Sequence, residues 1–110
     1  MYNKYSSKKT TVDNIKFDSK KEANRYLELK LLEKTGKIYI LELQPKYLLQ
    51  ERFTDNTGKK HREINYIADF RYIENDKIIV EDTKGFRTEI YKIKKKILLY
   101  KYKEIIFKEL

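Results

Sequence analysis

YIADFRYI at residues 66–73 and KIIVEDTKG at residues 77–85 are the two runs of sequence that decide the fold. Both alternate with a period of two, which is typical of β-strands. The polar, turn-prone segment between them, residues 74–76, predicts that the two strands form an antiparallel hairpin. Both sides of the first run are largely apolar, so we expect it to be an interior strand.

Two acids and a lysine interrupt these apolar runs. Pairing about the turn brings Asp69 within reach of Asp82 and Lys84 at one end of the sheet. Carboxylates that approach one another repel and are costly to desolvate, and a hard divalent cation such as Mg²⁺ is the usual solution. The residues alone leave a second interpretation open, in which Asp82 and Lys84 form a solvated ion pair and Asp69 pairs with Arg71 or Lys84.

The order of residues after Val80 leaves two candidate acids side by side. Strand alternation places Asp82 on the same side as Lys84, and Glu81 on the other side, so Asp82 is the better candidate. An acid, any residue and a lysine also occur at residues 18–20 and 28–30, so this spacing alone identifies nothing.

Composition limits the chemistry. The chain has 110 residues, enough for one domain with a single core. It contains no cysteine, which excludes disulfides and thiolate zinc sites, and its one histidine, His61, makes a histidine-based metal site or a catalytic triad a poor explanation. Any metal must therefore be held by oxygen.

The charge balance points to a polyanionic partner. Lysine and arginine total 26 against 17 acids, a formal charge of +9, and the chain has 10 tyrosines. Basic charge with interspersed aromatic residues suits nucleic acid best, although compositional bias is an alternative explanation. No apolar run is long enough to cross a bilayer and the N-terminus lacks the apolar core of a signal peptide, so we expect a cytoplasmic protein that does not bind membranes.

The remaining sequence predicts one domain at residues 14–110, preceded by a basic flexible arm at residues 1–13. A helix is expected at residues 19–35, because Ser19 and Glu22 have the spacing of a capping box and Gly36 can end it. Glu22 has two interpretations, a helix cap or a metal ligand offered from the first helical turn.

Strands are expected before and after Pro45, which should mark a bend or an edge, followed by a loop at residues 54–60. After residue 88 an amphipathic helix is predicted, with a strongly basic face. Its predicted apolar side consists of Ile90, Tyr91, Ile93, Ile97, Leu98 and Tyr102. We expect Arg87, Lys92 and Lys95 to contact phosphates, with solvation of these cations as the alternative. Residues 104–108 should form a last short strand.

The predicted order is therefore helix, strand, strand, strand, helix, strand, and in this order the chain resembles the PD-(D/E)XK nuclease superfamily. More narrowly, it is similar to small phage-encoded endonuclease-like proteins related to Holliday-junction resolvases. Four blocks carry the resemblance: FDSKKEA at residues 17–23, LQPKY at residues 43–47, YIADF at residues 66–70 and VEDTKG at residues 80–85. Ala68 stands where the superfamily's named proline would be, and Asp82 replaces its more frequent glutamate.

The resemblance implies an α/β (α+β) fold with a restriction-endonuclease-like core, in which a central mixed sheet is flanked by helices. It implies that the protein is a Mg²⁺-dependent endonuclease, with Mn²⁺ as a substitute ion, acting on double-stranded or branched DNA such as Holliday junctions. Asp69 and Asp82 would hold the ion, helped by the Thr83 carbonyl and by Glu22. Lys84 would orient the attacking water or stabilise negative charge, and Gly85 would let the backbone approach the substrate.

Three other functions remain open on the sequence. The enzyme could cut a nick, a flap or a single duplex site, whereas symmetric cutting of a junction would call for a homodimer. The chain could instead be a catalytically silent nucleic-acid-binding module, or a protein-interaction factor. Phosphate contacts would make affinity fall steeply with salt, which separates nucleic-acid binding from the last alternative.

Overall fold

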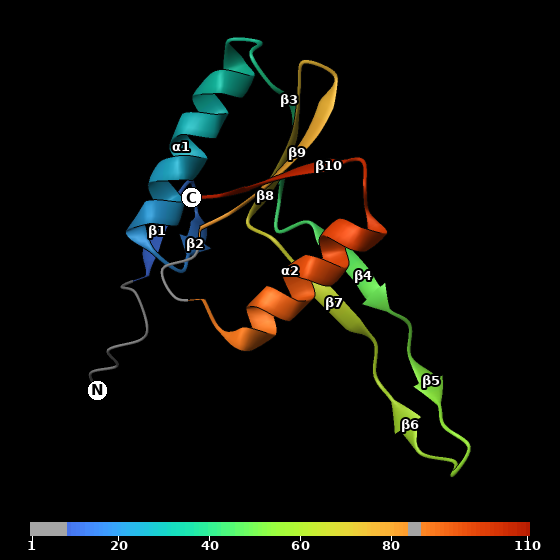
Figure 1. Ribbon diagram of the computed structural model, residues 1–110. Coiled ribbons are helices and arrows are strands. Elements are labelled where there is room, and N and C mark those ends of the chain that lie inside the picture. Colours follow the sequence, from blue (N-terminus) through green and yellow to red (C-terminus); the bar gives the residue numbers. More distant parts are fainter. Residues whose placement is uncertain (1–8, 84–86) are drawn as a thin grey trace.

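The structure is a computed structural model that describes residues 9–83 and 87–110 (Figure 1). The elements of these residues are, in order, β1 (Thr10–Val12), β2 (Ile15–Phe17), α1 (Lys20–Lys34), β3 (Tyr39–Leu43), β4 (Lys46–Gln50), β5 (Phe53–Thr54), β6 (Lys60–His61), β7 (Ile64–Ile67), β8 (Phe70–Glu74), β9 (Lys77–Asp82), α2 (Glu89–Lys101) and β10 (Ile105–Glu109).

A four-stranded mixed sheet is the centre of the fold, with strand order β10-β9-β8-β3. Strand β9 is antiparallel to β8 and parallel to β10, and β3 is antiparallel to β8. The predicted hairpin is confirmed: Glu74 pairs with Lys77, and Asn75 and Asp76 between them both have positive φ, as a two-residue type I′ turn requires. The predicted mixed α/β class is likewise confirmed.

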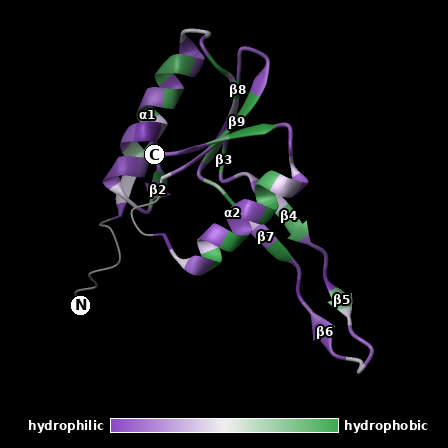
Figure 2. Ribbon diagram, in the orientation of Figure 1, coloured by the Kyte–Doolittle hydropathy of each residue, from purple (hydrophilic) through white to green (hydrophobic). Residues whose placement is uncertain are grey.

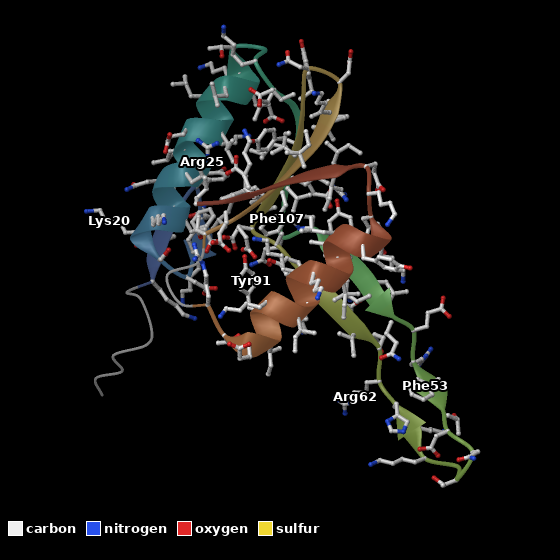
Figure 3. The ribbon with its side chains drawn as sticks, viewed as in Figure 1. Lys20, Arg25, Phe53, Arg62, Tyr91 and Phe107 are labelled. Carbon is white, nitrogen blue, oxygen red and sulfur yellow. The ribbon has the colours of Figure 1, made fainter. Side chains whose placement is uncertain are left out.

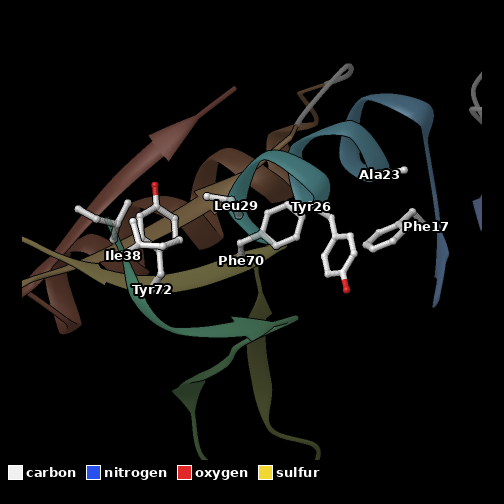
Figure 4. Packing of buried hydrophobic residues seen from close by; sticks show 8 residues of the cluster. Phe17, Ala23, Tyr26, Leu29, Ile38, Phe70 and Tyr72 are labelled. Carbon is white, nitrogen blue, oxygen red and sulfur yellow. The ribbon is translucent and has the colours of Figure 1, made fainter. Parts of the chain in front are cut away.

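Helix α1 covers one face of the sheet. Ser19 is its N-cap and accepts a hydrogen bond from the Glu22 amide at 3.1 Å, and the chain leaves the helix through Gly36 at φ 80°. The helix predicted at residues 19–35 is therefore confirmed to within a residue at each end. Figure 4 shows the apolar cluster that it buries against β8 and β9, made by Phe17, Ala23, Tyr26, Leu29, Ile38, Phe70, Tyr72 and Ile79.

Helix α2 covers the opposite face, since Val80 packs beneath it whereas its neighbour Ile79 packs beneath α1. The predicted apolar side of α2 is only partly right. Tyr91 and Leu98 are buried, but Ile90, Ile93 and Ile97 are exposed. The buried arc is therefore narrow, and Lys94 and Lys95 are half-buried beside it.

The first of the two deciding runs is not one continuous strand. Strand β7 ends at Ile67 and pairs with β4, and β8 begins at Phe70 and pairs with β3 and β9. Tyr66 and Ala68 pack on the α2 side, whereas Phe70 packs on the α1 side. The strand breaks at residues 68 and 69 because the chain passes there from the two-stranded sheet of β4 and β7 into the four-stranded sheet.

Strands β4 and β7 continue into the short pair β5 and β6, and together they project from the body of the molecule (Figure 1). The loop expected at residues 54–60 is the tip of this projection, flanked by β5 and β6. His61 lies there, stacked on Phe53 at 4.7 Å between ring centroids and bonded through Nε2 to Asp55 at 2.8 Å.

Residues 10–13, which were predicted to belong to the flexible arm, instead form part of a hairpin. Strands β1 and β2 form a hairpin in which Val12 pairs with Ile15, and both pack against the α1 cluster. Asp13 and Asn14 have positive φ and make the same turn as residues 75 and 76. Residues 1–8, which make up most of the expected arm, lie outside the described residues. Within the part of the chain that is described, neither helix has the length and apolarity to cross a membrane.

Candidate functional site

Asp69 lies at the break between β7 and β8, held by its backbone on both sides. Its amide donates to the Glu81 carbonyl at 3.1 Å, and its own carbonyl accepts from the Gln44 amide at 2.9 Å. Its carboxylate accepts hydrogen bonds from the Thr83 amide at 2.7 Å and the Thr83 hydroxyl at 2.6 Å. The side chain is therefore fixed at the end of the sheet, beside the point where the chain leaves β9.

Asp82 is the last residue of β9 and is fully buried. The Tyr66 hydroxyl donates a hydrogen bond to its carboxylate, and burial followed by this bond raises the pKa of Tyr66 far above its ordinary value. Because Phe70 pairs with Glu81, the next positions along β8 and β9 are those of Asp69 and Asp82. The hairpin register thus brings together the two acids that the sequence selected.

Glu22 reaches the same end of the sheet from the first turn of α1, where it is buried. Its pKa rises to about 7, first because burial penalises the carboxylate and then because Asp69, Asp18 and Asp82 repel its charge. The amide of Asp18 partly offsets the rise by hydrogen bonding to the Glu22 carboxylate. The Glu22 amide therefore takes part in the helix cap while the Glu22 carboxylate lies near Asp18, Asp69 and Asp82, and its role as a metal ligand stays a prediction.

The acid cluster is defined here as Asp18, Glu22, Asp69 and Asp82. Asp18 was not among the predicted site residues; its place in the FDSKKEA block next to the N-cap of α1 was the available signal. Carboxylates alone suit a hard cation such as Mg²⁺. Across residues 9–83 and 87–110, however, no three Asp, Glu or His side chains are arranged as a ready-made metal site. The described cluster has suitable donors but not a closed coordination shell.

Glu81 is used quite differently from its neighbour Asp82. Its fully buried carboxylate accepts hydrogen bonds from Arg25 Nε at 2.8 Å and Arg25 Nη2 at 2.6 Å, and from the Tyr72 hydroxyl. Figure 3 shows Arg25 on the side of α1 that faces the sheet. Arg25 lies one turn after Glu22, so this ion pair fixes the helix that carries Glu22 against the strand that carries Asp82.

Lys84 and Gly85, which the resemblance assigns to catalysis and to backbone approach, lie outside the described residues. Thr83 is described: it is half-buried, and its amide and hydroxyl are both directed at Asp69.

The three predicted phosphate contacts, Arg87, Lys92 and Lys95, lie together. They line a hollow of about 280 Å³ with Tyr91, Lys96, Leu99 and Glu109. The structure adds Glu109 to this basic hollow, since its carboxylate pairs with Arg87 and with Lys95 at 3.6 Å. Nothing in the sequence marked Glu109, because only the parallel pairing of β10 with β9 places it beside Asp82.

Tyrosines connect the basic hollow with the acid cluster. The Tyr91 hydroxyl donates to Glu109, which together with the two cations keeps the pKa of Glu109 below its ordinary value. The Tyr91 ring lies 6.2 Å from the Tyr66 ring, and Tyr66 in turn contacts Asp82. Tyr91 is labelled on α2 in Figure 3. Tyr66, Tyr91, Asp82 and Glu109 lie on four different elements that only the folded structure brings together, which is why the sequence did not reveal these contacts.

Comparison with known proteins supplies a family. Neither the curated proteins nor the solved structures include a significant match. A family model does match, over residues 2–109, and its description is protein of unknown function (DUF1064). Because the match covers nearly the whole chain, the protein belongs to the DUF1064 family.

Proposed function

We propose that this protein is a metal-dependent endonuclease that hydrolyses DNA phosphodiester bonds, with branched DNA such as a four-way junction as its substrate. The observation that carries the proposal is the convergence of Glu22, Asp69 and Asp82 at one end of the sheet, where β9 ends and the segment with Lys84 begins. Glu22 lies in α1, Asp69 between β7 and β8, and Asp82 at the end of β9, so their proximity is a product of the fold and not of local sequence.

The electrostatics of the acid cluster favour a cation. Asp82 is fully buried and Glu22 nearly so, and burial, followed by repulsion from Asp69, Asp18 and Asp82, raises the pKa of Glu22 to about 7. An isolated arrangement of this kind costs stability, whereas a divalent ion would convert the repulsion into binding energy. A bound Mg²⁺ ion supplies Lewis-acid chemistry, lowering the pKa of water and neutralising charge on the phosphoryl group.

The residues of the chain have separate roles in this proposal. Asp69 and Asp82 hold the ion, helped by Glu22 and the Thr83 carbonyl. The hydrogen bonds from Thr83 to Asp69 and from Tyr66 to Asp82 restrict the two carboxylates to one orientation. Lys84 orients the attacking water or stabilises the negative charge that develops. Arg87, Lys92 and Lys95 bind the DNA backbone at the basic hollow.

The direct test is cleavage of a labelled four-way junction, with linear duplex and flap substrates alongside, in Mg²⁺, in Mn²⁺ and in chelator. Asp82→Asn keeps the size of the side chain and removes the charge, and it should reduce cleavage by about a thousandfold or more. Glu104→Ala removes an exposed acid outside the cluster and is the matched control. Paired cuts that require metal would support the junction specificity, whereas metal-dependent cutting of every substrate would keep the nuclease and discard that specificity.

A catalytically silent nucleic-acid-binding module is the second candidate, supported by the gathering of Arg87, Lys92 and Lys95 around one hollow. Such a protein would bind DNA with steep salt dependence and never cut it. Absence of cleavage on all substrates and with both metals, with salt-sensitive binding intact, would overturn the catalytic proposal in favour of this one.

A further inference from the structure

The exposed surface of α2 divides lengthwise into two stripes of different chemistry. One stripe faces the basic hollow and carries Lys92, Lys95 and Lys96. The other stripe, which we call the apolar seam, consists of Ile90, Ile93, Ile97 and Tyr100, with exposed fractions of 68, 58, 38 and 76%. Figure 2 shows apolar segments alternating with polar ones along α2. Tyr91 and Leu98 are buried beneath this helix, whereas the seam is left exposed by residues 9–83 and 87–110.

The spacing of the apolar seam is that of a helix-packing surface. Its residues follow one another at intervals of three, four and three, which is the a/d pattern of a coiled coil. A stripe this narrow, along a helix about 20 Å long, fits the side of a second helix. At its N-terminal end the seam opens into a hollow of about 300 Å³ between Ile67 of β7 and Ile90, which could accept one large side chain.

The charges beside the apolar seam decide what kind of helix fits. In the a/d register, Lys94, Lys96 and Lys101 occupy flanking positions and Glu89 is the one acid among them. A second copy of this chain would therefore bring an excess of lysine against lysine along both sides of the seam, which is costly at an interface. A partner with acids in the flanking positions would instead pair with these lysines.

Nucleic acid fits this stripe poorly. Isoleucine side chains cannot pair with phosphates, and the cations suited to a DNA backbone lie on the other stripe of α2, around the basic hollow. The two stripes could therefore be occupied at the same time by different ligands.

We propose that the apolar seam of α2 is a docking site for an amphipathic helix of another protein, with an apolar stripe flanked by glutamate or aspartate. The proposal does not depend on the nuclease activity. It predicts that the protein binds DNA and its partner protein on adjacent sides of one helix.

The test uses a synthetic three-heptad peptide with leucine at a and d and glutamate at e and g, labelled for fluorescence anisotropy and added to the full chain. Saturable binding is expected, and Ile93→Glu should weaken it by about tenfold or more. Leu31→Glu on α1 is the matched control, since Leu31 is 62% exposed and Ile93 58%, and it should leave binding unchanged.

Charge reversal gives a second test that leaves the apolar seam intact. Lys94→Glu combined with Lys96→Glu should weaken binding of the glutamate peptide and improve binding of an otherwise identical lysine peptide. Circular dichroism and cooperative thermal unfolding establish that each variant is folded.

The proposal is overturned by three results. No binding of the glutamate peptide, or equal binding of both peptides, would show that the seam does not select an acidic helix. Self-association in sedimentation velocity that disappears in Ile93→Glu would assign the seam to a second copy. Binding of the wild type to anionic vesicles, lost in the same variant, would assign it to a membrane surface.

Discussion

Glu81 and Asp82 are consecutive acids at the end of β9, and both are fully buried, yet their surroundings differ completely. Glu81 faces α1 and is held by two guanidinium nitrogens of Arg25 and by the Tyr72 hydroxyl. Asp82 faces the other side, receives the Tyr66 hydroxyl and lies close enough to Glu22 to raise its pKa. The charge of Glu81 is neutralised within the protein, whereas the acid cluster concentrates negative charge.

This difference distinguishes a buried acid that stabilises the fold from buried acids that serve a function. A buried acid paired with arginine has a structural role: it holds two elements together, as the Arg25–Glu81 ion pair, called the strut below, holds α1 against β9. A buried acid whose pKa is raised by burial and by neighbouring carboxylates lowers stability when it is charged, and such acids are found where a protein binds a cation or performs chemistry. Disrupting the ion pair of Glu81 should therefore lower stability, whereas removing the charge of an acid in the cluster should raise it, and this makes the comparison testable.

The largest effect is expected from breaking the strut. Arg25→Met leaves Glu81 buried without its cation and should lower the free energy of unfolding by about 3 kcal/mol, because removal of one partner strands the other charge. Denaturant unfolding of the variant measures the loss. Combining Arg25→Met with Glu81→Leu should recover part of it, since the buried charge is removed but the Tyr72 hydroxyl loses its acceptor. An equally large loss in the double variant would show that packing of Arg25, and not charge, is what matters.

The second-largest effect is expected from Mg²⁺ binding at the acid cluster. If the acid cluster binds Mg²⁺, the ion should stabilise the folded protein by about 2.7 kcal/mol at a hundred times its dissociation constant. Thermal unfolding with increasing Mg²⁺, and then with excess chelator, would reveal the rise and its reversal. Asp82→Asn should abolish the rise, whereas Arg25→Lys should leave much of it because it keeps a cation beside Glu81. A rise of the same size in Asp82→Asn would place the ion elsewhere.

A smaller effect is expected from the charge of Glu22 in the absence of metal. Its folded-state pKa of about 7 lies above its ordinary value of 4.5, so the folded protein binds the proton more tightly than the unfolded chain does. Stability from this group is thus complete below pH 4.5 and is lost as the pH rises through about 7.

The variant that tests this is Glu22→Gln, which cannot ionise. In chelator at pH 8 it should be more stable than the wild type by about 1–2 kcal/mol, and at pH 5 the advantage should shrink towards zero. Urea unfolding at the two pH values measures it. A variant that is less stable than the wild type at pH 8 would mean that the cap, and not the repulsion, dominates at this position.

The sequence predicted those parts of the fold that depend on local patterns. The capping box predicted helix α1. The alternation at residues 77–83 predicted that Glu81 and Asp82 lie on opposite faces of the sheet. The polar turn at residues 74–76 predicted the hairpin register that brings Asp69 close to Asp82. The hairpin at residues 10–17 was missed, although Asp13 and Asn14 carry the same turn signal as Asn75 and Asp76. Its two strands have only three residues each, which is too short for an alternating pattern to stand out.

What depends on contacts between distant segments could not be predicted. Helical periodicity predicted an apolar side of α2 but not how much of that side would be covered, and Ile90, Ile93 and Ile97 are exposed. The Arg25–Glu81 pair joins residues 56 positions apart, and no local pattern specifies such a partner. The metal, the DNA substrate and the role of Lys84 remain predictions from the resemblance.

The smallest effect concerns Ser19, which caps the helix on which both regions depend. Its hydroxyl accepts the Glu22 amide, and α1 carries Arg25 to the strut and Glu22 to the acid cluster. Ser19→Ala should cost about 1 kcal/mol in denaturant unfolding, and Ser19→Asp, which restores a capping oxygen, should recover it. If the strut alone holds α1 in place, the alanine variant should keep the Mg²⁺ response of the wild type despite its lower stability. A variant that loses the Mg²⁺ response while remaining folded would show that the cap positions Glu22. The stability of α1 and the geometry of the acid cluster would then depend on each other.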